Sequence, residues 1–402
     1  MNLVDERFSS PSLRALVALA VVFVMLATTG WTALRHHKGG GDALSVATAA
    51  WRHGSLGGRA LPDPQAGADV VARFFASVGP DRAKRLADRY PLVVGNLNGA
   101  PIALRYQANR RSLLTARTQE TARSHSRLLT AEGRRDAAQR ADRYASLLDG
   151  KRQILAFDPT GRGRAAEVFG DLDAADRVSI VVPGVDTDVL SFERDADPTR
   201  APVGMARSLY DAERAGAPDT RTAVIAWADY TTPRGVGLDA STGELAEQGA
   251  VRLTALVKAL PARGAVSLFC HSYGSVLCGV AAPDLPSGRV SDIAVFGSPG
   301  MRVDKAADLD TAARVWATRD GTDWIGDVPH LEIAGIGHGA DPVSRAFGAR
   351  VVTSAGAEGH AGYFRSGTDS LANFTNIALG RYPDVRCVTD SDCTAGVAQG
   401  LR

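Results

Sequence analysis

The sequence predicts an α/β fold in which a mostly parallel sheet is covered by helices on both faces. Short runs rich in β-branched and aromatic residues recur between 151 and 380, with RVSIVV at 177–182 as an example. Such runs indicate strands. Between them lie stretches with the helical period, most clearly 242–260, which ends at a proline. Strands that alternate with helices favour a parallel sheet between two helical layers. The predicted strands are 152–158, 164–172, 177–187, 222–230, 265–269, 292–298, 313–318 and 350–354.

The size and charge of the chain give no indication of a nucleic-acid-binding protein. The chain has 402 residues, enough for one large domain with additions. It carries 46 basic and 44 acidic residues, so no excess of positive charge favours a nucleic acid as partner. No metal, nucleotide or flavin motif occurs, and the acidic stretches lack the full calcium-loop pattern. We therefore expect no cofactor and no bound metal.

The N-terminal segment resembles a membrane anchor. Residues 15–34 contain no charged side chain, and about 20 apolar residues suffice to span a hydrocarbon core as a helix. A cleaved signal peptide, whose apolar region is shorter, is the alternative. We predict a tail and transmembrane anchor at 1–39, followed by an irregular, glycine-rich linker at 40–64.

A helical extension is expected between the linker and the sheet, at 65–150. Apolar residues at helical spacing predict one helix over 69–90, and proline and glycine–asparagine pairs predict turns over 91–110. The region 111–149 mixes charges of both signs and reads as one or two solvent-exposed helices. The catalytic domain is assigned to 151–380 and a C-terminal tail to 381–402.

The four cysteines fall into two pairs. Cys387 and Cys393 lie close together in a polar tail, so we predict that they form a disulfide, with two free thiols as the alternative. Cys270 and Cys278 are interpreted as small buried apolar residues. Basic residues are almost balanced on the two sides of 15–34, so the tail disulfide decides the predicted orientation: a single-pass membrane protein with its body outside the cytoplasm.

A strand-to-helix turn carries the candidate nucleophile. The predicted strand 265–269 runs directly into Cys-His-Ser-Tyr-Gly, with Ser272 at its centre. A nucleophile elbow has this strand–turn–helix setting and needs small residues two before and two after the serine. Gly274 meets that need, and Cys270 stands where a glycine is usual. The alternative is that Ser272 caps an ordinary helix.

A serine hydroxyl needs a base held by a third group. In elbow folds the order along the chain is serine, acid, histidine. His360 follows the last predicted strand in a glycine-flanked loop and is the predicted base, with His338 as the alternative. Asp323 follows the seventh predicted strand and is the predicted acid, with Asp320, three residues earlier, as the alternative.

The oxyanion of a tetrahedral intermediate requires two N–H donors. One would be the backbone N–H of Tyr273, the residue after the nucleophile. The other would come from the loop after the third strand, where Gly184 permits close approach of the backbone. We predict Val185 as this second donor.

Several motifs together resemble the α/β-hydrolase superfamily, and more closely an actinobacterial branch long described as a domain of unknown function. That branch carries an elbow similar to Gly-His-Ser-Tyr-Gly-Ser, from which this chain departs at Cys270. The resemblance covers about 65–380 and implies a serine hydrolase fold without defining a substrate. The motifs that carry it are His271–Ser275, Val182–Gly184, Gly297–Gly300, Gly359–His360 with Tyr363, and the upstream stretch Val94–Arg110.

The sequence therefore predicts a membrane-anchored serine hydrolase, of esterase or lipase type, that acts on an ester, thioester or amide through a covalent acyl-enzyme. The substrate would be a small molecule or a lipid-like ester. The alternative is a non-catalytic interaction protein that keeps the fold and uses 111–149 as a contact surface. No pattern specifies the acyl preference or the oligomeric state.

Overall fold

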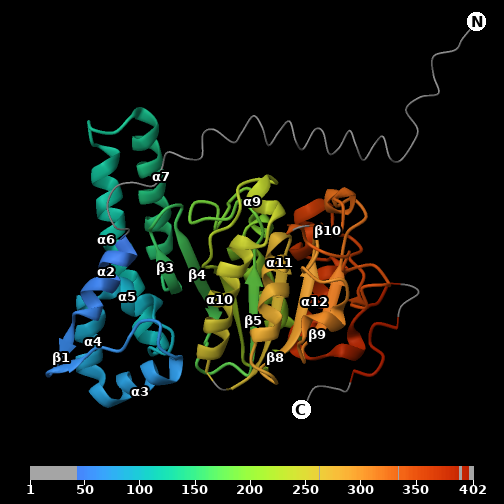
Figure 1. Cartoon of the computed structure of the whole chain (residues 1–402), viewed down its shortest axis with the longest axis horizontal. Coiled ribbons are helices and arrows are strands. Elements are labelled where there is room, and N and C mark those ends of the chain that lie inside the picture. The colour runs from blue at the N-terminus through green and yellow to red at the C-terminus, as the bar shows by residue number, and fades with distance from the viewer. Residues whose placement is uncertain (1–42, 262, 334, 389–391, 398–402) are drawn as a thin grey trace, which may run out of the picture. The chain divides into compact units, whose positions relative to one another are not determined.

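The computed structural model of the protein describes residues 43–261, 263–333, 335–388 and 392–397 (Figure 1). The predicted membrane span at 15–34 lies outside these residues. Within the part of the chain that is described, no helix is both long and apolar enough to cross a membrane.

An eight-stranded sheet forms the centre of the molecule, in the order β12-β9-β8-β7-β5-β6-β4-β3. All neighbouring pairs from β12 to β6 are parallel, and β4 runs antiparallel to both β6 and β3. The predicted mostly parallel sheet is thus confirmed. The strands are β3 (Gln153–Asp158), β4 (Arg164–Gly170), β5 (Arg177–Val182), β6 (Thr222–Ala228), β7 (Ala265–His271), β8 (Val290–Phe296), β9 (Arg314–Thr318) and β12 (Arg350–Val351).

Helices cover the sheet on both faces, as predicted (Figure 1). One core contains the apolar side chains of α10 (Glu244–Ala259) and α11 (Tyr273–Ala281), and the other those of α8 (Pro202–Gly216) and α12 (Asp369–Leu379). Central strands such as β5 are buried on both faces, which explains their continuous apolar runs. Short elements complete this region: α9 (Leu238–Ser241), β10 (Glu332–Ile333) and β11 (Ile336–Gly337).

The N-terminal part of the described chain is helical, but its elements differ from several expectations. The predicted single helix over 69–90 is two helices, because Gly79 has a φ of 75° and Pro80 starts a new helix. The stretch 91–110 was expected to be turns, yet it contains α5 and the start of α6. These helices are α3 (Ala68–Val78), α4 (Pro80–Arg89), α5 (Pro91–Asn96), α6 (Ile102–Ser124) and α7 (Ala131–Leu148).

The predicted irregular linker at 40–64 is wrong for the residues that are described. A helix, α2 (Ala43–Arg52), buries Trp51, whose ring packs edge-on against Tyr90 at 5.4 Å between ring centroids. A short hairpin of β1 (Ser55–Leu56) and β2 (Arg59–Ala60) follows. The segment therefore packs on the helical extension, and the domain boundaries at 64, 150 and 380 stay predictions.

The upstream stretch Val94–Arg110 fixes the edge of the sheet. The Asn96 side chain donates to the backbone oxygen of Phe157 at 2.8 Å and accepts from its N–H at 3.0 Å. Asn109 donates to the backbone oxygens of Gly95 and Ile154, both at 2.9 Å. Side-chain amides thus take the place of a further strand beside β3, which leaves fewer unpaired edge groups.

Both cysteine pairs are disulfides. The Cys387–Cys393 bond has the predicted partners, with Cα atoms 5.6 Å apart. The prediction that Cys270 and Cys278 are merely small apolar residues is wrong, because they are bonded to each other with Cα atoms 6.5 Å apart. The sharp turn between β7 and α11 folds the helix back against the strand, and this brings residues eight positions apart within bonding distance.

Candidate active site

The turn between β7 and α11 has the geometry of a nucleophile elbow. Ser272 connects them with φ 52° and ψ −126°, a conformation that non-glycine residues adopt only under strain. It stands at the N-cap position of α11 but makes no side-chain capping hydrogen bond. The helix-cap interpretation of Ser272 therefore has no support in the geometry.

Two glycines make this turn possible. A Cβ atom on Gly274 would lie 2.5 Å from the carbonyl oxygen of Val182, closer than such contacts occur. A Cβ atom on Gly184 would lie 2.6 Å from the Cβ of Ser272 and 3.1 Å from its Oγ. The loop after β5 therefore passes directly against the serine, and Cβ atoms at these positions would push the two apart.

Asp323 and His360 are in direct contact. His360 Nδ1 lies 2.8 Å from Oδ1 of Asp323, and Tyr363 donates its hydroxyl to Oδ2 at 2.6 Å. The N–H of Ile325 also donates to Oδ1 at 3.0 Å. Burial alone would raise the pKa of the Asp323 carboxyl, but the hydrogen bonds from His360 and Tyr363 hold this pKa below its usual value. Asp323 is thus a buried carboxylate directed at an imidazole.

The two alternative residues have other contacts. His338 is buried, and its Nε2 lies 2.6 Å from the carbonyl oxygen of Ala240. Asp320 accepts from the N–H of Thr322 at 3.0 Å and from the N–H of Gly359 at 3.3 Å. Asp320 thereby orders the loop that precedes His360.

No hydrogen bond joins Ser272 to His360 in the described residues. The Nε2 atom of His360 is buried and has no hydrogen-bond partner there. The backbone oxygen of His360 lies 2.6 Å from Nε2 of His271, the residue before the serine. Catalytic hydrogen bonds in unliganded enzymes are often long and tighten when substrate binds. The structure thus pairs the predicted acid and base and ties the base to the elbow.

Three neighbours of the site carry contacts that sequence reasoning did not assign. His271 stacks on Phe296 at 5.0 Å between ring centroids, and burial lowers its pKa to about 3, so the ring stays neutral. The ring of Trp324 packs on the ring of His360, with 4.8 Å between the ring centroids. Tyr363 lies three residues after His360 in a 3-10 helix (Gly359–Phe364), where such residues share one side. The His-x-x-Tyr spacing could have revealed this last contact.

The two predicted oxyanion donors flank the serine. Tyr273 is the first residue of α11, so its N–H has no acceptor inside the helix. Val185 follows Gly184, and its N–H donates to no other described residue. Neither N–H group therefore has an acceptor among the described residues, and the oxyanion role of both stays a prediction.

The Gly297–Gly300 motif is hydrogen-bonded to the helix that follows the elbow. Ser275 Oγ, on the first turn of α11, lies 2.6 Å from Ser298 Oγ and 3.2 Å from the carbonyl oxygen of Gly300. Gly297 has a φ of 53°, and a Cβ there would lie 2.9 Å from Oδ2 of Asp323. The motif thus leaves room for the Asp323 carboxylate and holds α11 through Ser275.

The comparison with protein families agrees with this architecture. Residues 158–333 match the alpha/beta hydrolase family, a region that begins at the end of β3 and includes the elbow and Asp323. The predicted resemblance to the α/β-hydrolases is confirmed over residues 158–333, which contain most of the sheet and the elbow.

Curated relatives are mycobacterial. An uncharacterized protein of Mycobacterium tuberculosis is 28% identical over 386 residues, which cover 80% of this chain and 57% of the relative. An uncharacterized protein of Mycobacterium bovis is 34% identical over 151 residues, which cover 36% of this chain and 55% of the relative. The chain thus spans just over half the length of these relatives.

Solved structures with related folds share little sequence. The 2,6-dihydroxy-pseudo-oxynicotine hydrolase is 13% identical, with a TM-score of 0.34, over 81% of this chain and 95% of that chain. Est1E from Butyrivibrio proteoclasticus is 12% identical, with a TM-score of 0.35, over 57% of this chain and 98% of that chain. Similarity at this level says nothing about the substrate of the present protein.

Proposed function

We propose that the protein is a serine hydrolase in which Ser272, His360 and Asp323 form the catalytic triad. The observation that carries the proposal is the 2.8 Å contact between Asp323 and His360, beside a serine in strained elbow geometry. The three groups come in the chain order expected of this fold. The match of residues 158–333 to the alpha/beta hydrolase family supports the same assignment.

The proposed reaction has two halves. Ser272 Oγ attacks the substrate carbonyl while its proton passes to His360 Nε2, and the N–H groups of Tyr273 and Val185 stabilise the resulting oxyanion. The proton then moves from Nε2 to the leaving group as its bond breaks, which leaves an acyl-enzyme. Water repeats the sequence on the acyl-enzyme, with His360 again as base, and releases the acid.

An apolar substrate group is supported by the surroundings of the site. Two loops lie near the site, one that precedes α10 and one that follows β9. The Tyr273 hydroxyl donates to the backbone oxygen of Thr242 in the first loop at 2.8 Å, and Nε2 of His338 in the second loop contacts the backbone oxygen of Ala240 in the first. In Figure 1, α9 and β10, which belong to these loops, lie toward the same end of the body. Both loops expose large apolar side chains, namely Val236, Leu238, Trp324, Leu331 and Ile336. Such a rim favours esters with an apolar acyl or alcohol group.

A fluorophosphonate probe tests the mechanism. The full chain should be labelled on one serine, and Ser272→Ala should abolish the labelling. Ser241→Ala removes a hydroxyl on α9 and serves as the matched control, which should label normally. Absence of labelling in the wild-type chain would favour the non-catalytic interaction protein instead.

A series of p-nitrophenyl esters tests the substrate class. We expect kcat/KM to rise with acyl length, by up to about fourfold for each CH2 group that the rim buries. Leu238→Gln together with Ile336→Gln should flatten this dependence without affecting the acetate ester. A flat dependence in the wild-type chain would remove the apolar substrate from the proposal but leave the triad.

We also propose that the body lies outside the cytoplasm and that 15–34 anchors it. Two disulfides support an oxidising compartment, since cytosolic thiols are kept reduced. Protease added to intact cells should digest the body, and a thiol reagent should label no cysteine before reduction. A protected body with free Cys387 and Cys393 would reverse the orientation.

A further inference from the structure

A cavity of about 430 Å³ lies between the N-terminal helices and the β3–β4–β6 part of the sheet. Its size falls in the range of small-molecule sites. None of the proposed catalytic residues lines it. Its charged lining residues are Arg105, Asp229, Arg252 and Lys258.

Arg105 is a buried cation that makes no direct ion pair with a described residue, and the nearby carboxylate of Asp229 stabilises its charge only from a distance. Only 3% of its surface is exposed. Its Nε donates to the carbonyl oxygen of Gly95 and its Nη1 to Oδ1 of Asn98, both at 3.2 Å and both neutral acceptors. No described residue accepts from Nη2. Burial lowers the pKa of the guanidinium to about 10, which is still high enough to keep it charged at neutral pH. A buried charge of this kind is costly unless an opposite charge compensates it.

The one carboxylate in the cavity wall already has a partner. Arg252 donates through Nη2 to Oδ1 of Asp229 and through Nε to its backbone oxygen, both at 2.6 Å. Arg164 lies 3.8 Å from the same carboxylate. Lys258 is exposed at the cavity mouth and makes no ion pair with the described residues. The lining therefore keeps an excess of positive charge.

Other parts of the wall suit an organic anion. Gly67 and Ala68, at the start of α3, line the cavity. The carboxylate of Asp69 already accepts from the first N–H groups of this helix, so the helix start contributes only its dipole to the cavity. Leu155, Trp227 and Leu256 supply apolar surface in the same cavity.

We infer that this cavity binds a small organic anion, with a carboxylate or phosphate group against Arg105 and an apolar body against Trp227. The buried guanidinium and the vacant Nη2 fix the position of the acidic group. The site is independent of the proposed triad, because the two share no residue.

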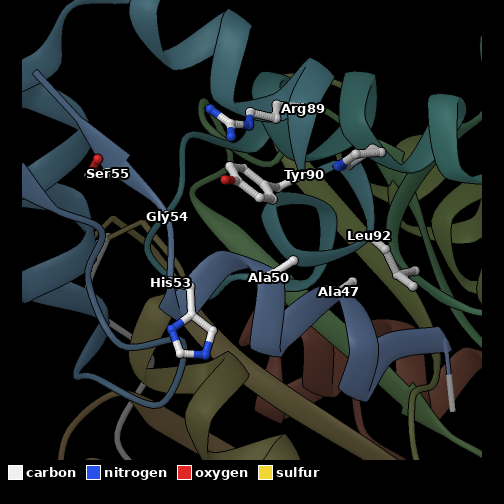
Figure 2. A pocket seen from close by; sticks show the side chains of 9 residues that line it. Ala47, Ala50, His53, Gly54, Ser55, Arg89, Tyr90 and Leu92 are labelled. Atoms are coloured by element: carbon white, nitrogen blue, oxygen red, sulfur yellow. The ribbon is translucent and has the colours of Figure 1, made fainter. Parts of the chain in front are cut away.

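A second hollow on the protein contains an arginine that, unlike Arg105, is exposed to solvent. It is lined by residues of α2 and of the α4–α5 junction, including His53, Arg89 and Tyr90 (Figure 2). Arg89 is exposed and lies over the ring of Tyr90 at 5.2 Å, so water solvates its charge. In Figure 2 the His53 side chain stands apart from these two. Arg89 is therefore a suitable control residue.

Calorimetric titration of the full chain tests the inference, with phenyl phosphate and benzoate as probes at constant ionic strength. We expect saturable binding of one probe molecule per chain, equally in the Ser272→Ala variant. The two probes distinguish a phosphate site from a carboxylate site. Lys258→Glu should weaken binding by about tenfold, and Arg105→Met by about 10- to 100-fold. Arg89→Glu should leave it unchanged.

Three results would overturn the inference. The first is the absence of saturable binding of either probe to the wild-type chain. The second is binding that Ser272→Ala abolishes. The third is binding that Lys258→Glu and Arg89→Glu weaken equally. If Arg105→Met fails to fold, as judged by circular dichroism, the exposed Lys258 variant still decides the outcome.

Discussion

Two buried carboxyl groups lie at opposite ends of the parallel strands, and their pKa values are shifted in opposite directions. Asp323 follows β9 at the end that carries the elbow. Glu213 lies on α8 near the first residues of β5, at the other end, where it accepts from Ser179 Oγ at 2.6 Å. Neither carboxyl is exposed to solvent.

The difference lies in the donors around each group. Asp323 accepts from His360, Tyr363 and the N–H of Ile325, and its pKa is lowered although it is buried. Glu213 accepts a single hydroxyl, and its Oε2 has no hydrogen-bond partner in the described residues. Burial raises the pKa of Glu213 to about 8. Burial opposes the charge of both carboxyl groups. Hydrogen bonds overcome it at Asp323, whereas Glu213 has too few donors and stays a neutral acid, so only Asp323 suits the acid position of a triad.

The largest expected effect is on turnover and comes from replacing a member of the proposed triad. Ser272→Ala or His360→Ala should lower kcat by about three to six orders of magnitude, and Asp323→Asn by about four, with the fold intact. Steady-state assays on a p-nitrophenyl ester measure this. His338→Gln is the matched control and should retain turnover within about tenfold. Near-normal turnover of His360→Ala would remove His360 from the mechanism.

At the opposite end, Glu213 should make stability depend on pH. The pKa of Glu213 is about 8 in the folded state and about 4.3 in the unfolded state. The contribution of Glu213 to the free energy of unfolding is therefore fully present below pH ~4 and is lost as the pH rises toward 8. The loss is at most about 1.4 kcal/mol per pH unit. Urea unfolding between pH 5 and 8 should show that Glu213→Gln abolishes this part of the slope. Equal slopes in the two proteins would show that Glu213 is ionised when folded.

The two disulfides differ in their distance from the elbow. Each closes a short loop, so replacing either cysteine pair by serine should cost about 2 to 3 kcal/mol of unfolding free energy. Only the Cys270–Cys278 pair flanks the elbow, so only its removal should also lower turnover. Cys270→Leu should inactivate the enzyme because a large side chain would displace the turn. Full activity of Cys270→Leu would contradict the elbow geometry.

The smallest expected effect concerns the extra donor to Asp323. Tyr363→Phe removes the hydroxyl bonded to Oδ2, so kcat should fall by about tenfold, in line with one lost hydrogen bond to a charged group. The pKa of Asp323 should rise at the same time, so activity should fail at a higher pH on the acid side of the profile. An unchanged pH profile would reduce Tyr363 to a packing role.

Local pattern was sufficient for much of the fold and of the site. Apolar runs that must be buried on both faces, such as β5 and β7, stand out in a single sequence. The elbow was readable because strand, serine and Gly274 are adjacent in the chain. Chain order and loop position predicted the contact that joins Asp323 to His360. The membrane anchor remains a prediction from sequence.

Contacts between distant segments could not be read in this way, because they depend on how the chain packs. Asp320 and Asp323 look alike in sequence, and only the fold directs Asp323 at His360 while Asp320 bonds the N–H of Gly359. The same holds for Cys270, whose partner is chosen by the turn that returns α11 to β7. Arg105 reads as one arginine among many, and its burial beside a cavity arises only when α6 packs near the sheet. Sequence thus determined the elements and the order of the chemical groups, whereas tertiary packing decided their partners, because desolvation and hydrogen bonding act on the folded environment of each side chain.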